Sequence, residues 1–307
     1  MYSPDKVKKL WDAIKQTLEK MTRKIIRCRS GGFCDGVSRA VGMALRANAS
    51  GLRVHMDGEL VHNSSVTQYL LSHGICIWDG SSREWRSDEC LLIRAHGISL
   101  ERRELLRKLG CRLCDATCPH VARIGGKISQ FRRMGYFIIL YGDERHPEIL
   151  GLKSYGGDSI HVLSSVEQLT SIPCLRRCPH IAILSQTTAS SEDFQFFASA
   201  VAREFPWIEI FDSICEATRI RQMEIDGHIG RGQCDGAIVV GSPHSSNAKK
   251  LADKFLLANI PVAFVENLED LQNHHVLPGD GTILLTGGTS TPPWEIDAIE
   301  SYLRQIQ

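Results

Sequence analysis

Three cysteines occupy equivalent places in the sequence. They are Cys34 in Gly-Gly-Phe-Cys-Asp-Gly-Val, Cys118 in Asp-Ala-Thr-Cys-Pro-His-Val and Cys215 in Asp-Ser-Ile-Cys-Glu-Ala-Thr. Each follows a predicted strand and precedes a helical pattern, so the three thiols can meet at one point and bind a metal centre. Structural zinc usually takes four protein ligands, whereas an iron–sulfur cube held by three cysteines keeps one iron open for a substrate.

Two polar clusters recur after each cysteine, and the first of them recurs at nearly equal distances. The first begins at His62, His146 and Ser245, and the second lies at His96, Thr187 and Ser290. In open α/β sheets, ligands bind outside the carboxyl ends of the strands, where loops and helix N-termini converge. We therefore expect the loops of three similar units to form one site. Three ordinary α/β units with polar loops are the alternative.

The recurring polar residues suit the oxygens of a phosphate group. The candidate donors are His62, His96, His146, Ser245, Ser246, Asn247 and Ser290. The chain has neither a Walker A motif nor a glycine-rich dinucleotide fingerprint. Glu148 is the one carboxylate in this collection, which makes it the candidate proton donor. Taken singly, a histidine is more often structural, and a glutamate after proline is usually the acidic first turn of a helix.

Most of the other cysteines are expected to be structural. Cys111, Cys114 and Cys118 spell part of a bacterial ferredoxin signature, but they lack its further C-x2 step. Cys111 and Cys114 lie on or beside a predicted strand, where free cysteine acts as a small hydrophobic residue. The same interpretation covers Cys28, Cys76, Cys90 and Cys234. Cys174 and Cys178, in a proline-bounded loop, leave a local metal or redox pair as a minor alternative.

Strand-like and helical patterns alternate along the chain. The predicted strands are 24–28, 53–56, 91–95, 111–115, 136–141, 181–185, 208–211, 237–240, 262–265 and 282–286. Strands separated by crossover helices imply parallel α/β sheets. The expected units are 24–117, 118–214 and 215–307, the last ending in a helix. Residues 1–23 carry apolar residues at helical spacing with acidic residues among the lysines, which predicts an amphipathic helical extension rather than a transit peptide.

Composition excludes several classes of protein. In 307 residues, 36 lysines and arginines balance 35 acidic residues, so no basic field of the kind that holds nucleic acid is present. No run of about 18 apolar residues could span a membrane. Eleven cysteines without an apolar signal segment indicate a reducing compartment, and we expect a cytoplasmic protein.

In these motifs the sequence resembles the 4-hydroxy-3-methylbut-2-enyl diphosphate reductases, the LytB-type iron–sulfur reductases of the non-mevalonate isoprenoid pathway. The resemblance runs from about Lys24 to the C-terminus. It rests on Gly-Phe-Cys-Asp-Gly-Val, Glu-Leu-Val-His-Asn, Arg-Ala-His-Gly, Asp-Ala-Thr-Cys-Pro, His-Pro-Glu, Ser-Gln-Thr-Thr, Ile-Cys-Glu-Ala-Thr, Gly-Ser-Pro-His-Ser-Ser-Asn and Gly-Thr-Ser-Thr-Pro, in that order. It implies three α/β units around a pseudo-threefold axis with a central iron–sulfur cluster.

The resemblance also implies a role for each motif. Cys34, Cys118 and Cys215 would ligate one [4Fe-4S] cluster with an open apical iron. The diphosphate would be held by His62, His96, His146, Ser245, Ser246, Asn247 and Ser290. Glu148 and Thr187, with His146 beside them, would serve the hydroxyl-bearing end of the substrate. In the family, two electrons and one proton expel that hydroxyl as water, and a second proton is added to the resulting allyl-type anion to give isopentenyl or dimethylallyl diphosphate. A ferredoxin or flavodoxin-like protein supplies the electrons.

The sequence departs from the family in its N-terminal extension, in its extra cysteines and in reading Gly-Gly-Thr-Ser in the last motif. These departures leave open a diverged reductase that acts on a related allylic substrate. A non-enzymatic iron–sulfur electron carrier or redox sensor would use the same cysteines, but it leaves the phosphate donors and Glu148 unexplained. A zinc-dependent hydrolase is a weaker alternative.

Overall fold

The computed structural model describes residues 23–81, 84–274 and 281–306. The helical extension expected at 1–23 lies outside the described residues, except for Arg23, which begins the first strand. In the described part of the chain, no helix is long and apolar enough to cross a membrane.

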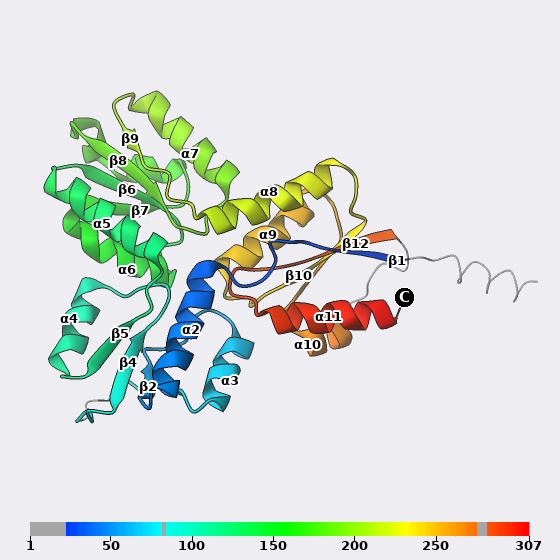
Figure 1. Cartoon of the computed structure of the whole chain (residues 1–307). Helices are drawn as coiled ribbons and strands as arrows, with labels where there is room; N and C mark the ends of the chain where they lie inside the picture. The colour runs from blue at the N-terminus through cyan, green and yellow to red at the C-terminus, as the bar shows by residue number, and fades with distance from the viewer. Residues whose placement is uncertain (1–22, 82–83, 275–280, 307) are drawn as a thin grey trace, which may run out of the picture.

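Three four-stranded parallel sheets form the framework, as the alternating strand and helix patterns predict. The first sheet runs in the order β3 (Cys76–Ile77), β2 (Arg53–Met56), β4 (Glu89–Ile93), β5 (Arg112–Asp115). The second runs β7 (Ile160–Leu163), β6 (Phe137–Tyr141), β8 (Ile181–Ser185), β9 (Glu209–Ile210). The third runs β11 (Val262–Val265), β10 (Gly236–Val240), β12 (Gly281–Gly287), β1 (Arg23–Arg27). In Figure 1 the three sheets occupy three lobes that meet near the middle of the molecule.

The three sheets share one strand order, and this order corrects the expected division of the chain. The edge strand β1 takes the place in the third sheet that β5 and β9 take in the first and second. The strand expected to open a unit at 24–117 therefore pairs with β12 instead, and Ile25 is buried in the core of the third sheet. Sequence proximity did not settle its partner, because an apolar edge strand can add to any open parallel edge of suitable register.

Helices cover these sheets. They are α2 (Asp35–Ala49), α3 (Ser64–Ser72), α4 (Leu100–Lys108), α5 (Pro119–Arg133), α6 (Pro147–Gly156), α7 (Ser191–Glu204), α8 (Glu216–Gly230), α9 (Ser246–Leu257), α10 (Leu268–His274) and α11 (Pro293–Gln305). Short 3-10 turns occupy Gly157–Ser159, Glu167–Ser171 and Pro173–Arg177. Several starts follow local chemistry: α5 and α6 begin with proline at the first helical position, and Asn63 caps α3 by accepting from the Val66 amide at 3.0 Å.

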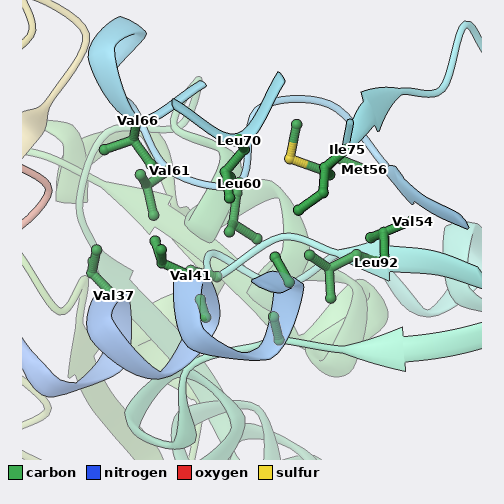
Figure 2. Packing of buried hydrophobic residues seen from close by; sticks show 14 of the residues in the cluster. Val37, Val41, Val54, Met56, Leu60, Val61, Val66, Leu70, Ile75 and Leu92 are labelled. Carbon is green, nitrogen blue, oxygen red and sulfur yellow. The ribbon is translucent and has the colours of Figure 1, made fainter. Parts of the chain in front are cut away.

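The helix that follows β1 packs on a different sheet from β1 itself. Val37 and Val41 of α2 lie in the hydrophobic cluster of the first sheet, together with Leu60 and Leu92, as Figure 2 shows. Burying one such side chain contributes about 1.5 to 3 kcal/mol, so these contacts fix α2 on the first unit. In the same way α5 follows β5 but packs in the second unit, and α8 follows β9 but packs in the third. Each cysteine turn therefore joins two units.

The ten predicted strands are all present, with ends shifted by up to two residues. Two further strands, β3 and β7, were not predicted. The two residues of β3 are both exposed, so no alternation of apolar and polar residues marked it. Cys76 lies in this strand and is exposed, so its expected place in the core was wrong. Cys28, Cys90 and Cys234 are buried, as predicted.

Candidate functional site

One cavity gathers every residue that the sequence singled out. Its lining includes Cys34, Cys118, Cys215, His62, His96, His146, Glu148, Thr187, Ser245, Ser246, Asn247 and Ser290. The parallel strands explain this convergence, because the polar residues follow the carboxyl ends of strands and precede helices. The three units therefore form one shared site.

The three cysteines have the same local structure. Each is the residue immediately before a helix, at the start of α2, α5 and α8. Their backbone amides donate to equivalent carbonyls, Cys34 to Thr289 at 3.1 Å, Cys118 to Ala95 at 2.9 Å and Cys215 to Thr187 at 2.9 Å. Each of these carbonyls lies two residues past the end of a central strand. The cysteine turns are thus tied to the strand ends that carry the polar residues.

A glycine allows two of the thiols to approach. A Cβ atom on Gly36 would lie 2.7 Å from the Cys118 Sγ and 3.8 Å from the Cys34 Sγ. Any other residue at this position would collide with the Cys118 thiol. Gly36 was not singled out as a site residue, although it belongs to the Cys-Asp-Gly motif.

Two of the thiols, Cys118 and Cys215, are shifted toward their neutral form. Burial raises the pKa of Cys118, the amides of His120 and Val121 lower it, and the nearby Cys34 and Cys215 raise it again. Burial likewise raises the pKa of Cys215. A bound metal reverses this balance, because metal binding stabilises the thiolate.

None of the other cysteines lines this cavity. The Cys111 thiol contacts the Leu106 carbonyl oxygen at 3.7 Å, and Cys114 packs against the core of the first unit. Neither lines the cavity. The Cys178 thiol donates to the Cys174 carbonyl oxygen at 3.4 Å. The ferredoxin-like run is thus split, with only Cys118 facing the cavity.

Three histidines from two units form a compact group. The ring of His62 stacks on that of His96 with centroids 4.4 Å apart, and His146 stands edge-on 5.6 Å from both. Burial lowers the pKa of each ring, and the nearby Arg94 charge lowers all three further. For His146 the pKa falls to about 4. The three rings are therefore neutral near pH 7 when no anion is bound.

Several buried polar atoms beside these rings lack a protein partner. Within the described residues, His62 Nε2, His96 Nδ1 and both side-chain polar atoms of Asn247 make no hydrogen bond. Leaving a buried polar group unpaired costs about 1 to 3 kcal/mol. Such groups, gathered around one cavity, are typical of a site whose partner is a ligand.

Two serines complete this polar end of the cavity. The Ser290 hydroxyl donates to the His62 carbonyl oxygen at 3.2 Å and lies 3.5 Å from the Ser245 hydroxyl. Ser245 caps α9 and accepts from the Ala248 amide at 3.3 Å. The helix N-termini of α3, α6 and α9 follow the polar loops, and their positive ends favour an anion.

Glu148 is a buried carboxyl group held by one neighbour. Its side chain is 2% exposed. The Thr187 amide donates to Oε1 at 2.7 Å, and the Thr187 hydroxyl donates to Oε2 at 2.5 Å. Burial raises the pKa of Glu148 and outweighs these two hydrogen bonds, which lower it. Glu148 can therefore hold a proton at a higher pH than an exposed carboxyl group.

His146 lies beside this carboxyl group in a defined orientation. Its Nδ1 accepts from the Glu148 backbone amide at 3.1 Å. A neutral ring that accepts at Nδ1 carries its proton on Nε2 and can donate from there. His146 is therefore set up to donate a hydrogen bond.

Sequence reasoning missed several lining residues. They are Gly36, His120, Thr188, Thr218 and Thr289, with the apolar Val37, Val61, Ala95 and Val121. Most lie within three residues of a recurring motif. Equivalence between the units could have found Thr289, which occupies the place of Ala95 and Thr187.

The fold and the cavity define an α/β protein built from three equivalent units around one polar, thiol-lined site. The family described as LytB protein matches residues 25–304, and this chain belongs to that family. The predicted family and the predicted three-unit α/β fold are confirmed.

Relatives agree over nearly the whole chain. A 4-hydroxy-3-methylbut-2-enyl diphosphate reductase from Opitutus terrae is 33% identical over 293 residues, covering 92% of this chain and 100% of the relative. The reductase of the same name from Aquifex aeolicus is 30% identical over 287 residues, covering 92% of this chain and 96% of the relative.

Solved structures show the same fold. The E-1-hydroxy-2-methyl-but-2-enyl-4-diphosphate reductase of Plasmodium falciparum superimposes with a TM-score of 0.79 at 29% identity, covering 92% of this chain and 88% of that chain. A second solved structure is that of (E)-4-hydroxy-3-methyl-but-2-enyl diphosphate reductase, described as the terminal enzyme of the non-mevalonate pathway. It superimposes with a TM-score of 0.65 at 27% identity, covering 93% of this chain and 100% of that chain. Membership of this family implies an iron–sulfur cluster.

Proposed function

We propose that this chain removes the hydroxyl group of 4-hydroxy-3-methylbut-2-enyl diphosphate by reduction, giving isopentenyl and dimethylallyl diphosphate. The observation that carries the proposal is a single cavity that joins three thiols, unpaired donors for an anion and a buried carboxyl group. An electron carrier needs only the thiols, so the other two features favour an enzyme.

The three cysteines fit a [4Fe-4S] cluster better than a single ion. Ligand atoms around one tetrahedral zinc lie about 3.8 Å apart when the zinc–sulfur bonds are 2.3 Å. Among the described residues, Cys34, Cys118 and Cys215 do not form a group whose ligand atoms all lie within 4.8 Å. When bound, such a cluster supplies electrons and an open iron for the substrate hydroxyl. The three helix N-termini at the cysteines offset the negative charge of the thiolates.

The polar end of the cavity would hold the diphosphate. His62 Nε2, His96 Nδ1 and the Asn247 amide have no protein partner, and the hydroxyls of Ser245 and Ser290 converge beside them. His146 and Ser246 complete the set. Binding a polyanion would raise the lowered pKa values of the histidines, so the rings take up protons and form stronger, charge-assisted bonds.

Glu148 would supply the proton that turns the substrate hydroxyl into water. Its raised pKa keeps the carboxyl group protonated further toward neutral pH, and burial shields it from solvent. Thr187 holds both carboxyl oxygens and is joined through its own carbonyl to the Cys215 amide. The acid is thus oriented relative to the cysteine turn.

The remaining assignments rest on the same proposal. A ferredoxin or flavodoxin-like protein would supply electrons. All eleven cysteines are free, which supports a reducing compartment such as the cytoplasm. We place the boundaries of the second and third units at Cys118 and Cys215, where the chain passes from one sheet to the next.

An anaerobic assay tests the proposal. The reconstituted chain is analysed for iron and sulfide, then mixed with the diphosphate substrate and a chemical reductant. We expect both products and a change in the cluster spectrum on adding substrate. A cluster spectrum that does not change when substrate is added would favour the electron carrier or redox sensor. Zinc without iron would favour the zinc-dependent hydrolase. Faster turnover of a related allylic diphosphate would indicate a diverged reductase.

A further inference from the structure

A buried arginine lies beside two of the three cysteine turns. Arg221 belongs to α8, follows Cys215 by six residues, and is 5% exposed. Arginine remains charged in proteins, and a buried charge is costly unless it is paired. Within the part of the chain that the structure describes, no carboxylate forms an ion pair with Arg221. Its charge must therefore be balanced in another way.

The guanidinium group of Arg221 bonds to backbone carbonyls of two cysteine turns. One terminal nitrogen donates to the Ala217 carbonyl oxygen at 2.7 Å, and the other donates to the Gly32 carbonyl oxygen. Ala217 lies two residues after Cys215, and Gly32 lies two residues before Cys34. The Nε atom is buried and makes no hydrogen bond within the described residues. One side chain thus connects the turns of two cysteines that are far apart in sequence.

A second residue of α8 strengthens the same connection. The Glu224 carboxylate accepts from the backbone amides of Arg29 at 2.7 Å and Ser30 at 2.9 Å, and also from the Ser30 hydroxyl. In Figure 1, α8 lies beside the blue loop between β1 and α2. Arg221 and Glu224 therefore hold opposite polar groups of this loop, the former a carbonyl and the latter two amides.

The negative groups whose charges act on Arg221 include two of the cysteines. Burial lowers the pKa of its guanidinium, and the charges of Cys34, Cys215, Glu224 and Asp35 raise it. Thiolates that carry a cluster are anionic in every redox state, and each added electron increases the negative charge. A fixed positive charge in a dry site favours the reduced state.

We propose that Arg221 is a positioning residue for the metal centre: it fixes the Cys34 turn against the Cys215 turn and supplies the positive charge that balances their thiolates. The inference rests on the proposed function only for the identity of the centre. Its two parts, hydrogen bonding and charge, can be separated by substitution.

Two variants separate them. Arg221→Met removes charge and hydrogen bonds at similar volume, whereas Arg221→Lys keeps the charge but cannot bridge both carbonyls in fork geometry. Arg231→Met is the matched control, because Arg231 is exposed at the end of the same helix and its side chain donates to the exposed Gln233 rather than to a cysteine turn. The holoprotein is titrated anaerobically for its reduction potential, and the release of iron to a chelator is followed in time.

The expected results differ for each variant. In Arg221→Met the cluster should bind an electron at least tenfold more weakly, which corresponds to a reduction potential about 59 mV more negative than that of the wild type. This variant should also release iron several-fold faster. Arg221→Lys should keep the potential of the wild type but release iron faster. Arg231→Met should match the wild type in both measurements.

Two outcomes would overturn the proposal. If Arg221→Met and Arg231→Met have the same reduction potential, the charge of Arg221 does not stabilise the reduced centre. If Arg221→Lys releases iron at the rate of the wild type, Arg221 does not position the cysteine turns. If Arg221→Met takes up no cluster, the proposal is decided by comparing iron release from Arg221→Lys with iron release from the wild type. If the wild type itself takes up no iron and sulfide, the proposed function fails. Hydrogen exchange then still tests Arg221, because the Cys34 amide should exchange faster in apo Arg221→Met than in apo Arg231→Met.

Discussion

The cysteine turns repeat across the three units, whereas the polar loops beside them do not. Every cysteine precedes a helix and donates to the same type of strand-end carbonyl. The polar loops instead carry His62 in the first unit, His146 with Glu148 in the second, and Ser245 with Asn247 in the third. A symmetric cluster needs three equal ligands, but a substrate with an anionic end and a hydroxyl end needs unlike partners. Under the proposed function, the repeated cysteine turns would supply the equal ligands, and the unlike polar loops would supply the partners of the substrate.

Removing one repeated ligand should have the largest effect. Cys34→Ser, Cys118→Ser or Cys215→Ser should each strip most of the iron, because the remaining thiols cannot hold the cluster in place. Iron and sulfide analysis after anaerobic reconstitution measures the loss. Cys111→Ser and Cys114→Ser are the controls. Loss of the cluster in these two, with Cys34→Ser intact, would instead support the ferredoxin-like run.

Among the unlike loops, Glu148 should matter most for turnover. General acid catalysis contributes roughly a hundredfold to ten-thousandfold, so Glu148→Gln should turn over at least about a hundredfold more slowly. The cluster spectrum and substrate binding should remain, since glutamine keeps the shape and one accepting oxygen. Turnover within a few fold of the wild type, at saturating reductant, would move the proton source to His146 or to the diphosphate.

The polar loop that carries His146 should make the stability of the apoprotein fall at acidic pH. The pKa of His146 is about 4 in the folded chain, against 6.5 for an ordinary histidine. Between pH 4 and pH 6.5 the unfolded state binds more protons than the folded state. The contribution of neutral His146 to the free energy of unfolding is therefore fully present above pH 6.5 and is lost as the pH falls toward 4. The full loss is about 3 kcal/mol.

Urea unfolding of the apoprotein at pH 7 and pH 4.5 measures this loss, with His146→Gln as the comparison. The raised pKa of Glu148 acts in the opposite direction, because its contribution is lost as the pH rises above 4.5. It is present in both proteins and cancels in the difference. Equal pH dependence of the two proteins would contradict the assigned shift.

The diphosphate donors should have the smallest individual effects. Asn247→Ala, His62→Ala and His96→Ala each remove one bond to a charged ligand, at about 2 kcal/mol, or roughly thirtyfold in affinity. Calorimetric titration with the diphosphate substrate measures the change, and the iron content should stay the same. Asn48→Ala, whose exposed amide donates to the His73 carbonyl oxygen, is the control. Unchanged affinity in all three variants would place the anion elsewhere.

The sequence predicted most strands and all the residues of the recurring motifs, because both depend on local patterns. Apolar runs mark strands such as Ile181–Ser185, and polar residues at strand ends mark the site. The sheet that β1 joins was not predictable, since its partner β12 lies at the other end of the chain. The contacts of Gly36 and Arg221 were missed for a similar reason, because each depends on two cysteine turns that are far apart in sequence meeting in space.

The pairing of β1 with β12 has a consequence for biosynthesis. Cys34 is synthesised long before Thr289, whose carbonyl accepts from the Cys34 amide, and before β12, the strand that fixes β1. Contacts of such high sequence separation form only after the intervening chain has been synthesised. The Cys34 turn can therefore reach its native position only after β12 has been synthesised. A truncated product that lacks β12 would retain all three cysteines but not the strand and the carbonyl that hold the Cys34 turn in place.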